Sequence, residues 1–430
     1  MFTKNLMIYL KFLILGLSIF PLFHLIYFKD GLTSLGFYNY IDEYILIFVA
    51  LIIGITIFFL KTKVLKIFVI YIISMLFCFF CFEVYLLSKF QKKKENGDTN
   101  EVLLYPEYLK KKDKGIKGAH VPPIYFLNNS KSKNYLPLSN LSNTLLIVCN
   151  ENNYYSIIKT DRFGFNNPNT EWDKKKFNFI FLGDSFTDGY CVNEKQSIPG
   201  NFRKKGFKGG IINLGVGGSG PLLEYATLKE YFPDKKVDIV YWIYYHGNDL
   251  ADLNTEMRNN ILKKYYYEEN FKQNLKNKKK EVEKIVNNQL NKNMQLYKTI
   301  SINKKKHFQF KNLVKLTYSR KFFRNIIDNY INLNPPKEFL KILEKSENYL
   351  KKKNTKLIFV YLPKNNNIKS NPKFVKSIKK LGIEVIDLGE KLENYDNKRA
   401  LFPISGIHHF SEFGYKIVSE LILKNSEINY

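Results

Sequence analysis

Four short polar blocks of the sequence carry residue types that together could perform ester chemistry. The first, the serine block FIFLGDSFTDG, places Ser185 after an apolar run and before a polar turn. A serine on a tight strand-to-helix turn faces a crevice, and its backbone N–H can stabilise negative charge. Serine is a weak nucleophile without help, so a base must lie elsewhere in the chain. Alone, the serine block is equally typical of an ordinary turn with a helix cap.

Three further blocks supply partners for this serine. The glycine block NLGVGGSG begins at Asn213, and its glycines let backbone N–H groups approach a ligand. The asparagine block YHGNDL offers the Asn248 amide as a donor to an oxyanion. The histidine block GIHHFSEFGY contains His408 and His409, and a histidine can act as a general base. Together the blocks indicate acyl transfer through a serine.

Serine, glycine, asparagine and histidine in this order resemble the four-block pattern of the SGNH (GDSL-type) hydrolases. The resemblance runs from about Phe177 to the end of the chain, apart from one insertion. It implies that Ser185 is the nucleophile and that Gly218 and Asn248 donate to the oxyanion beside the Ser185 N–H. Gly218 is chosen among the glycines because it lies five residues after Asn213, as in the family's block.

The resemblance also implies which histidine is the base. The family's histidine is followed five positions later by a glycine. Gly414 lies five positions after His409, so the resemblance implies that His409 is the base and that His408 packs or hydrogen-bonds locally. The family usually has an aspartate two or three residues before this histidine, where it orients the imidazole. Here those positions are Ile407 and Gly406, so Ser405 or a nearby carbonyl could hold the ring instead. We therefore expect a dyad, or a triad with an unidentified third member.

A further motif, which we call the lead-in loop, lies at 160–168, upstream of the serine block. TDRFGFNNP resembles a segment of membrane-anchored bacterial SGNH proteins associated with envelope glycans. Its plainer interpretation is a tight loop that fastens the upstream segment to the sheet. No cofactor or metal is expected, because no metal motif is found and GVGGSG lacks the Lys and Ser/Thr of a phosphate loop.

Alternating apolar runs and helical patterns must position the four blocks. The runs are short and rich in β-branched and aromatic residues, which is typical of buried parallel strands. They cover 177–183, 209–215, 237–245, 355–363 and 382–389, with helical patterns between them at 221–231, 337–353 and 372–381. The pattern predicts an α/β fold, a three-layer sandwich with a mainly parallel sheet (SGNH/flavodoxin-like), and ligands at the carboxyl ends of its strands.

The alternation is interrupted by a basic insertion at about 254–330. It holds 19 Lys and Arg against 6 Asp and Glu, a net charge of +13. A helical cap with a solvated basic face is the default interpretation, and a lid that attracts an anionic substrate is the sharper one. The expected domains are thus a membrane region at 1–90, a linker and small β-rich segment at 91–175, and an SGNH hydrolase-like domain at 176–430 that contains the insertion.

Three apolar segments near the N-terminus predict three transmembrane helices. They lie at about 6–28, 45–60 and 67–88, each near the roughly 20 residues that cross a bilayer. The loop KTKVLK between the last two is basic and very short, which places it in the cytoplasm and the domain after Lys89 outside. The lysines of KFQKKK after the third segment favour the reverse. We expect a multi-pass protein of the inner membrane with a periplasmic or other extracytoplasmic catalytic domain.

Composition narrows the classes of partner. The net charge of +28 would suit a nucleic-acid-binding protein, but no recognition motif supports that interpretation. Lys, Asn, Ile, Phe and Tyr are all abundant, as an AT-rich coding sequence would give without selection for charge. Four cysteines exclude a disulfide scaffold, and only Cys149 and Cys191 remain as a possible bridge.

The leading hypothesis is a membrane-anchored serine hydrolase or O-acyltransferase that acts on acyl esters of an envelope glycan or lipid. Ser185 would form an acyl-enzyme, with His409 as base and then acid. The alternative is a non-catalytic protein of the same fold that binds an anionic envelope polymer under its basic insertion. The missing aspartate favours this alternative, and the retention of all four block residues opposes it.

Overall fold

The chain folds into two compact units in the computed structural model. The first comprises residues 1–96 and 306–337, and the second comprises residues 97–305 and 338–430. The segment expected as one insertion thus contributes to both units. The structure describes residues 2–28, 33–96, 108–110, 114–127, 135–152, 154–302, 316–330, 334–364, 368–403 and 409–426.

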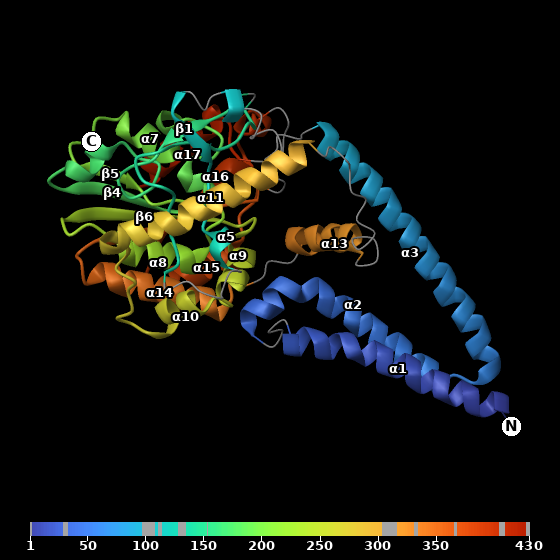
Figure 1. The fold of residues 1–430 in the computed structure, drawn as a ribbon. Helices are drawn as coiled ribbons and strands as arrows, with labels where there is room; N and C mark the ends of the chain where they lie inside the picture. The colour runs from blue at the N-terminus through green and yellow to red at the C-terminus, as the bar shows by residue number, and fades with distance from the viewer. Residues whose placement is uncertain are drawn as a thin grey trace. The chain divides into compact units, whose positions relative to one another are not determined.

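A five-stranded sheet forms the centre of the second unit (Figure 1). All of its strands are parallel and follow the order β5-β4-β6-β7-β8. The strands are β4 (Phe177–Gly183), β5 (Gly210–Asn213), β6 (Val237–Tyr245), β7 (Lys356–Leu362) and β8 (Glu384–Asp387). The expected mainly parallel α/β sheet is confirmed, and its carboxyl edge carries the serine, glycine and asparagine blocks.

Helices cover both faces of this sheet. Phe181 and Tyr241 stack on one face with ring centroids 5.1 Å apart, within a core that includes α7 (Ile198–Arg203) and α17 (Glu412–Asn425). On the other face, Tyr244 packs against aromatic rings of α14 (Lys337–Lys351) and α15 (Pro372–Lys379). The Trp242 indole N–H donates to Glu224 of α8 (Pro221–Tyr231) on that face. Burial on both faces explains why the strand sequences are almost continuously apolar.

The remaining described helices of this unit are short, apart from α11. They are α5 (Ile124–Leu127), α6 (Ser185–Asp188), α9 (Asp249–Glu256), α10 (Asn260–Tyr267), α11 (Lys279–Ile302) and α16 (Leu388–Glu393), with 3-10 turns η2 (Asn169–Asp173), η3 (Glu194–Gln196), η4 (Leu275–Lys278) and η5 (Lys398–Leu401).

A second sheet of three strands is built from the β-rich segment upstream. It comprises β1 (Ile116–Ala119), β2 (Leu145–Ile147) and β3 (Ile157–Lys159), with β2 and β3 antiparallel. Tyr297 and Met294 of the basic insertion, both on α11, pack on this sheet. The helix therefore covers the small sheet with its apolar face, while its lysines lie toward solvent.

The lead-in loop ties the small sheet to the central one. The buried Asp161 carboxylate accepts hydrogen bonds from the backbone of Phe163 and Phe165, from the Trp172 indole and from the Asn167 amide. Asn167 also pairs with the backbone of Asn213 at the end of β5. These contacts match the plainer interpretation of the motif, a loop that fastens two segments together.

The first unit consists of apolar helices α1 (Phe2–Phe28), α2 (Ser34–Phe59) and α3 (Thr62–Asn96), with α13 (Thr317–Tyr330). Among the described residues, two stretches are long and apolar enough to cross a membrane: Ser34–Phe59 and Ile67–Lys89. The apolar stretch of α1, Lys11–Ile26, is shorter than the roughly 20 residues that a span needs. The prediction of three transmembrane helices is therefore corrected to two candidate spans.

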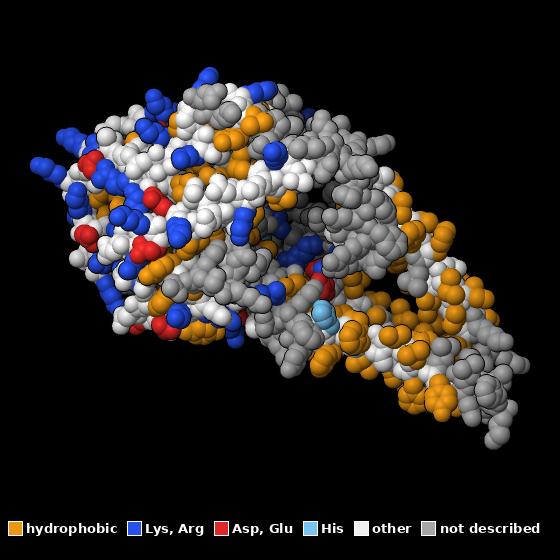
Figure 2. All heavy atoms as spheres, in the orientation of Figure 1, with side chains coloured by type: hydrophobic (Ala, Val, Ile, Leu, Met, Phe, Trp, Pro, Cys, Tyr) orange, Lys and Arg blue, Asp and Glu red, His pale blue; other side chains and the backbone are white. Residues whose placement is uncertain are grey.

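These apolar helices expose most of their side chains, as Figure 2 shows. Only 17% and 6% of the residues in the most apolar parts of the two candidate spans are buried. Glu83 of α3 is fully buried, and its carboxylate accepts hydrogen bonds from the backbone N–H groups of Tyr318 and Ser319 at the start of α13. Arg320 of the same helix pairs with Asp42.

Candidate active site

Ser185 lies at the turn between β4 and α6. Asp184 caps the helix by accepting from the Phe186 N–H at 2.9 Å. Gly183 permits the turn, because a side chain there would collide with Thr187 and with the carbonyl of Ile243 on the neighbouring strand. The turn brings the serine hydroxyl to the carboxyl edge of the sheet, as the serine block predicts.

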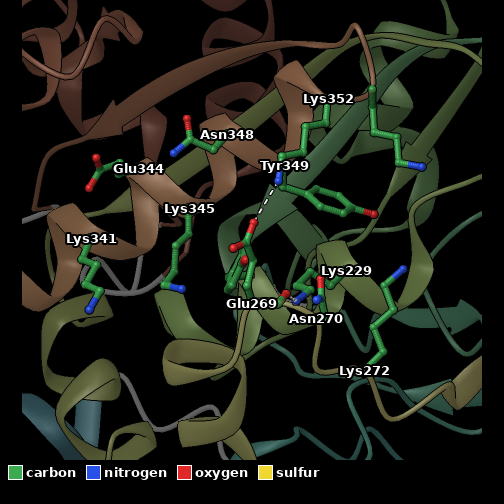
Figure 3. A pocket seen from close by; sticks show the side chains of 12 residues that line it. Lys229, Glu269, Asn270, Lys272, Lys341, Glu344, Lys345, Asn348, Tyr349 and Lys352 are labelled. Carbon is green, nitrogen blue, oxygen red and sulfur yellow. Dashed lines mark hydrogen bonds and ion pairs between the residues drawn. The ribbon is translucent and has the colours of Figure 1, made fainter.

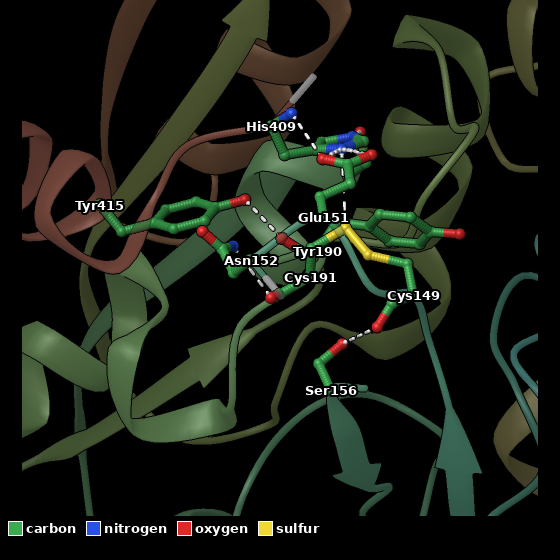
Figure 4. Close-up of a disulfide and its surroundings, with 9 residues drawn as sticks. Cys149, Glu151, Asn152, Ser156, Tyr190, Cys191, His409 and Tyr415 are labelled. Atoms are coloured by element: carbon green, nitrogen blue, oxygen red, sulfur yellow. Dashed lines mark hydrogen bonds and ion pairs between the residues drawn. A yellow bond between two sulfur atoms is a disulfide. The ribbon is translucent and has the colours of Figure 1, made fainter. Parts of the chain in front are cut away.

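A chain of hydrogen bonds runs from Ser185 through His409 to a glutamate that the four blocks do not contain. His409 Nε2 lies 2.8 Å from Ser185 Oγ. Figure 4 shows His409 beside Glu151, where Nδ1 lies 3.1 Å from Oε2 and 3.2 Å from Oε1. The carboxylate also accepts the His409 backbone N–H at 2.9 Å. Because a carboxylate only accepts, Nδ1 carries the proton and Nε2 is left to accept from the serine hydroxyl.

Glu151 comes from the turn of the small sheet. Beyond β2 and β3, backbone hydrogen bonds from the Ser156 N–H to Cys149 and from the Val148 N–H to Ser156 continue the pairing, and Glu151 lies in the turn that follows Cys149. A disulfide joins Cys149 to Cys191, six residues after the nucleophile, and the Asn152 amide donates to the Cys191 carbonyl. The turn that carries Glu151 is thus fastened covalently to the segment that carries Ser185.

Glu151 is the functional residue that the sequence analysis missed. It stands 258 positions before His409, whereas the family pattern directs attention to the residues just before the histidine. Ser405 and His408, which were considered there, lie outside the described residues. The one local signal was Cys149, since a disulfide between Cys149 and Cys191 brings the intervening turn close to the serine block.

The predicted oxyanion donors differ in what they contact. Within the described part of the chain, the backbone N–H groups of Ser185 and Gly218 have no hydrogen-bond partner, so both are available to a ligand. Gly217 faces the serine, because a side chain there would lie 3.6 Å from Ser185 Cβ. The Asn248 amide instead donates to Asp252 Oδ2 at 2.6 Å. The Asn248 side chain also hydrogen-bonds the Asp184 carboxylate, so an oxyanion would have to replace one of these two acceptors.

The small sheet contributes further residues beside the serine. His120, directly after β1, lies with Nε2 3.3 Å from Asp188 Oδ2, and both side chains are buried. The Gly217 N–H donates to the same carboxylate at 3.4 Å. Pro122 and Ile124 lie next to Gly218. The β-rich segment therefore lines the site and supports the glycine block.

Buried carboxyl groups lie beneath the asparagine block. Burial raises the pKa of Asp184 to about 6, of Asp252 to about 7 and of Glu256 to about 8. It also raises the pKa of Glu224 and Asp249 well above their ordinary values, with repulsion from Asp184 adding to the effect. A carboxyl group without water around it favours its neutral form.

These raised pKa values predict that the domain loses stability as pH rises. Between about pH 4 and pH 8 the folded state binds more protons than the unfolded state, so the free energy of unfolding falls with pH. Each proton held only by the folded state contributes about 1.4 kcal/mol per pH unit. We expect the melting temperature to fall between pH 5.5 and pH 8.5. Glu224→Gln, which keeps an acceptor for Trp242, should flatten the slope; an unchanged slope would contradict the assignment.

One group of potential metal ligands lies near the site. Among the described residues, Cys149, Glu151 and Cys191 have ligand atoms within 4.8 Å of one another. Both sulfurs are committed to the disulfide, however, and a metal would require thiolates. The arrangement does not fit a metal ion.

Comparisons with known proteins return only distant structural similarity. No family model and no curated protein matches the sequence. The chain is similar to a lipase/acylhydrolase from Enterococcus faecalis, with 14% identity, 58% of this chain and 94% of that chain covered, and a TM-score of 0.30. It is also similar to a two-domain esterase active on acetylated mannans, with 11% identity, 60% of this chain and half of that chain covered, and a TM-score of 0.32.

A third similar structure is a putative lipolytic protein of the G-D-S-L family from Desulfitobacterium hafniense. It is 14% identical, with 58% of this chain and 98% of that chain covered and a TM-score of 0.26. Identities and TM-scores this low leave the functional argument to the geometry of the site.

Proposed function

We propose that this protein is a membrane-anchored serine hydrolase or O-acyltransferase that acts on acyl esters of an envelope glycan or lipid. The observation that carries the proposal is the hydrogen-bonded chain from Ser185 through His409 to Glu151. A buried serine next to an imidazole that is itself held by a carboxylate is the arrangement that activates a hydroxyl for attack on an ester.

The reaction would proceed in two steps. His409 Nε2 takes the proton of Ser185 Oγ as the oxygen attacks the acyl carbon. The N–H groups of Ser185 and Gly218 and the Asn248 amide stabilise the oxyanion. Collapse of the intermediate expels the alcohol, which takes the proton from His409, and leaves an acyl-serine. Water or a sugar hydroxyl then accepts the acyl group by the reverse sequence. Throughout, Glu151 stabilises the imidazolium.

Glu151 also weakens the alternative that the protein only binds an anionic polymer. The missing aspartate of the histidine block was the argument for a protein that only binds a polymer. A carboxylate from another segment now stands at Nδ1 of His409, so the residues needed for catalysis are present together. This supports the enzyme over the binding protein.

The proposed location is the inner membrane, with the catalytic domain on its outer side. Exposed apolar helices near the N-terminus support an anchor, and the Cys149–Cys191 disulfide supports an oxidising compartment. A membrane-impermeant protease added to cells with a permeabilised outer membrane should remove the catalytic domain. Protection until the inner membrane is breached would contradict the location and the envelope substrate with it.

The activity itself is tested with the purified full-length protein in detergent. We expect hydrolysis of p-nitrophenyl acetate and covalent labelling by a fluorophosphonate probe, because the probe reports an activated serine. A protein that neither hydrolyses the ester nor reacts with the probe would contradict the proposal.

Asn248→Ala should lower kcat by about a hundredfold, because one oxyanion donor is typically worth roughly 3 kcal/mol in the transition state. The matched control is Asp252→Asn, which removes a charge but keeps an acceptor for the Asn248 amide. It should retain most of the turnover. Equal losses in the two variants would indicate that Asn248 acts by holding the buried carboxyl groups rather than by touching the oxyanion.

Breaking the disulfide should lower kcat by about tenfold, because the turn that holds Glu151 then loses its covalent link to the serine block. Closing a loop of 42 residues also typically stabilises a fold by 2–4 kcal/mol, so the melting temperature should fall. The variant is Cys149→Ser/Cys191→Ser, with Cys78→Ser/Cys81→Ser as the control that removes the free cysteines. In a Glu151→Gln background the loss of kcat should vanish. A full tenfold loss there would contradict the coupling.

A further inference from the structure

A lysine-lined pocket lies on the outer side of α8 and α14. Its volume is about 570 Å³, within the range of small-molecule sites. Figure 3 shows side chains of α14 around a group formed by Lys229, Glu269 and Asn270. The lining carries six lysines against two glutamates, together with the rings of two tyrosines: Lys229, Lys272, Lys341, Lys345, Lys352, Lys353, Glu269, Glu344, Tyr225 and Tyr349.

The pocket is separate from the active site. Helix α8 starts at Pro221, directly after the glycine block, and Lys229 follows eight residues later, about 12 Å along the helix at 1.5 Å per residue. Helix α14 ends at Lys351, before the start of β7, and so at the amino edge of the sheet. None of the lining residues belongs to the four blocks.

Lys229 is the feature that distinguishes this pocket from a solvated basic surface. The residue is only 3% exposed, although lysine is almost never buried without a partner. Its Nζ donates to the Glu269 carbonyl at 2.5 Å and lies over the rings of Tyr225 and Tyr265. An ammonium has three donors, and the described part of the chain offers this one no second hydrogen-bond acceptor.

Lysines near Lys229 add to the excess of positive charge in this pocket. Burial, with repulsion from Lys272 and Lys345, lowers the pKa of Lys229 to about 8, although the carboxylates of Glu230 and Glu269 act in the opposite direction. Within the described residues, neither Lys272 nor Lys345 has a carboxylate partner, since Lys272 lies over the Tyr349 ring and Glu269 pairs with Lys352. The lining therefore carries an excess of positive charge, six lysines against two glutamates, and the nearby carboxylates of Glu230 and Glu269 offset only part of it at Lys229.

We propose that this pocket binds a multivalent anion, one that carries phosphate or carboxylate groups. Such a ligand would supply the acceptors that Lys229 lacks and would offset the repulsion from Lys272 and Lys345. Lysine ammonium groups act as point charges and serve both kinds of anion. The proposal does not depend on ester chemistry at Ser185.

Isothermal titration of the full-length protein in detergent tests the proposal at about 0.15 M salt. Inorganic tripolyphosphate and tri-galacturonic acid are the two probes, and the tighter one identifies phosphate or carboxylate as the natural chemistry. Lys272→Gln/Lys345→Gln should weaken binding of the tighter probe at least tenfold. The control, Lys373→Gln/Lys376→Gln on exposed positions of α15, removes the same charge elsewhere and should change the Kd less than twofold. No binding of either probe, or equal weakening by both variants, would overturn the proposal.

Lys229 gives a second readout. At pH 8 binding should take up a fraction of a proton, so the measured heat should differ between buffers with different ionisation enthalpies. Lys229→Met should abolish this difference, and persistence of the proton uptake in a folded variant would contradict the role of Lys229. Turnover of p-nitrophenyl acetate should be the same in all of these variants, which separates this site from the proposed active site.

Discussion

Purified Ser185→Ala protein should lose all measurable turnover of p-nitrophenyl acetate and all labelling by a fluorophosphonate probe. The change removes the atom that forms the acyl-enzyme, and loss of a serine nucleophile in this kind of site lowers kcat by about a millionfold. The free energy of unfolding should change by no more than about 1 kcal/mol, because only one hydroxyl and its hydrogen bond to His409 are removed.

The matched control is Ser377→Ala on α15, where the hydroxyl donates to the Lys373 carbonyl one turn earlier. Turnover, labelling and melting temperature should all stay at the level of the unchanged protein. Hydrolysis by Ser185→Ala at the rate of the unchanged protein would mean that another group is the nucleophile. Loss of the folded state in Ser185→Ala would instead show that the hydroxyl is structural.

The central sheet could be predicted because its strands have a strong local signal. The expected runs at 177–183 and 237–245 coincide with β4 and β6, since strands buried on both faces must be apolar throughout. Strand β5 is shorter than its apolar run, because Leu214 and Gly215 belong to the turn of the glycine block. One transmembrane helix too many was predicted, because the apolar segment at 6–28 has the length of a span. Its apolar stretch within the described residues, Lys11–Ile26, is shorter than that.

The sequence predicts those site residues that directly follow a strand of the central sheet or precede a helix. Ser185, Gly218 and Asn248 lie in such turns, and the parallel sheet brings the turns to one edge. Glu151 has no such position, because it reaches His409 from a turn of a different sheet. Its place depends on tertiary packing and on the Cys149–Cys191 bond, and no spacing along the chain encodes either.

Glu151→Gln should lower kcat by about a thousandfold or more while KM changes little, since Glu151 contacts His409 and not the serine. A glutamine amide can donate to Nδ1, which favours the tautomer with the proton on Nε2 and so removes the acceptor that Ser185 needs. Glu151→Asp keeps a carboxylate on a shorter side chain and should recover part of the loss. The control is Glu412→Gln on α17, an exposed glutamate that accepts from the Tyr154 hydroxyl and should leave kcat unchanged.

Proton NMR can distinguish two roles of Glu151: orienting the His409 imidazole, as proposed, or only stabilising the fold. An imidazole N–H that donates to a carboxylate resonates far downfield, so the protein should show such a signal, and Ser185→Ala should retain it because the contact between His409 and Glu151 is intact. Glu151→Gln should lose the signal with its melting temperature little changed. If Glu151→Gln kept full turnover, Ser185 and His409 would suffice as a dyad, and the turn fastened by the disulfide would serve only to close the site.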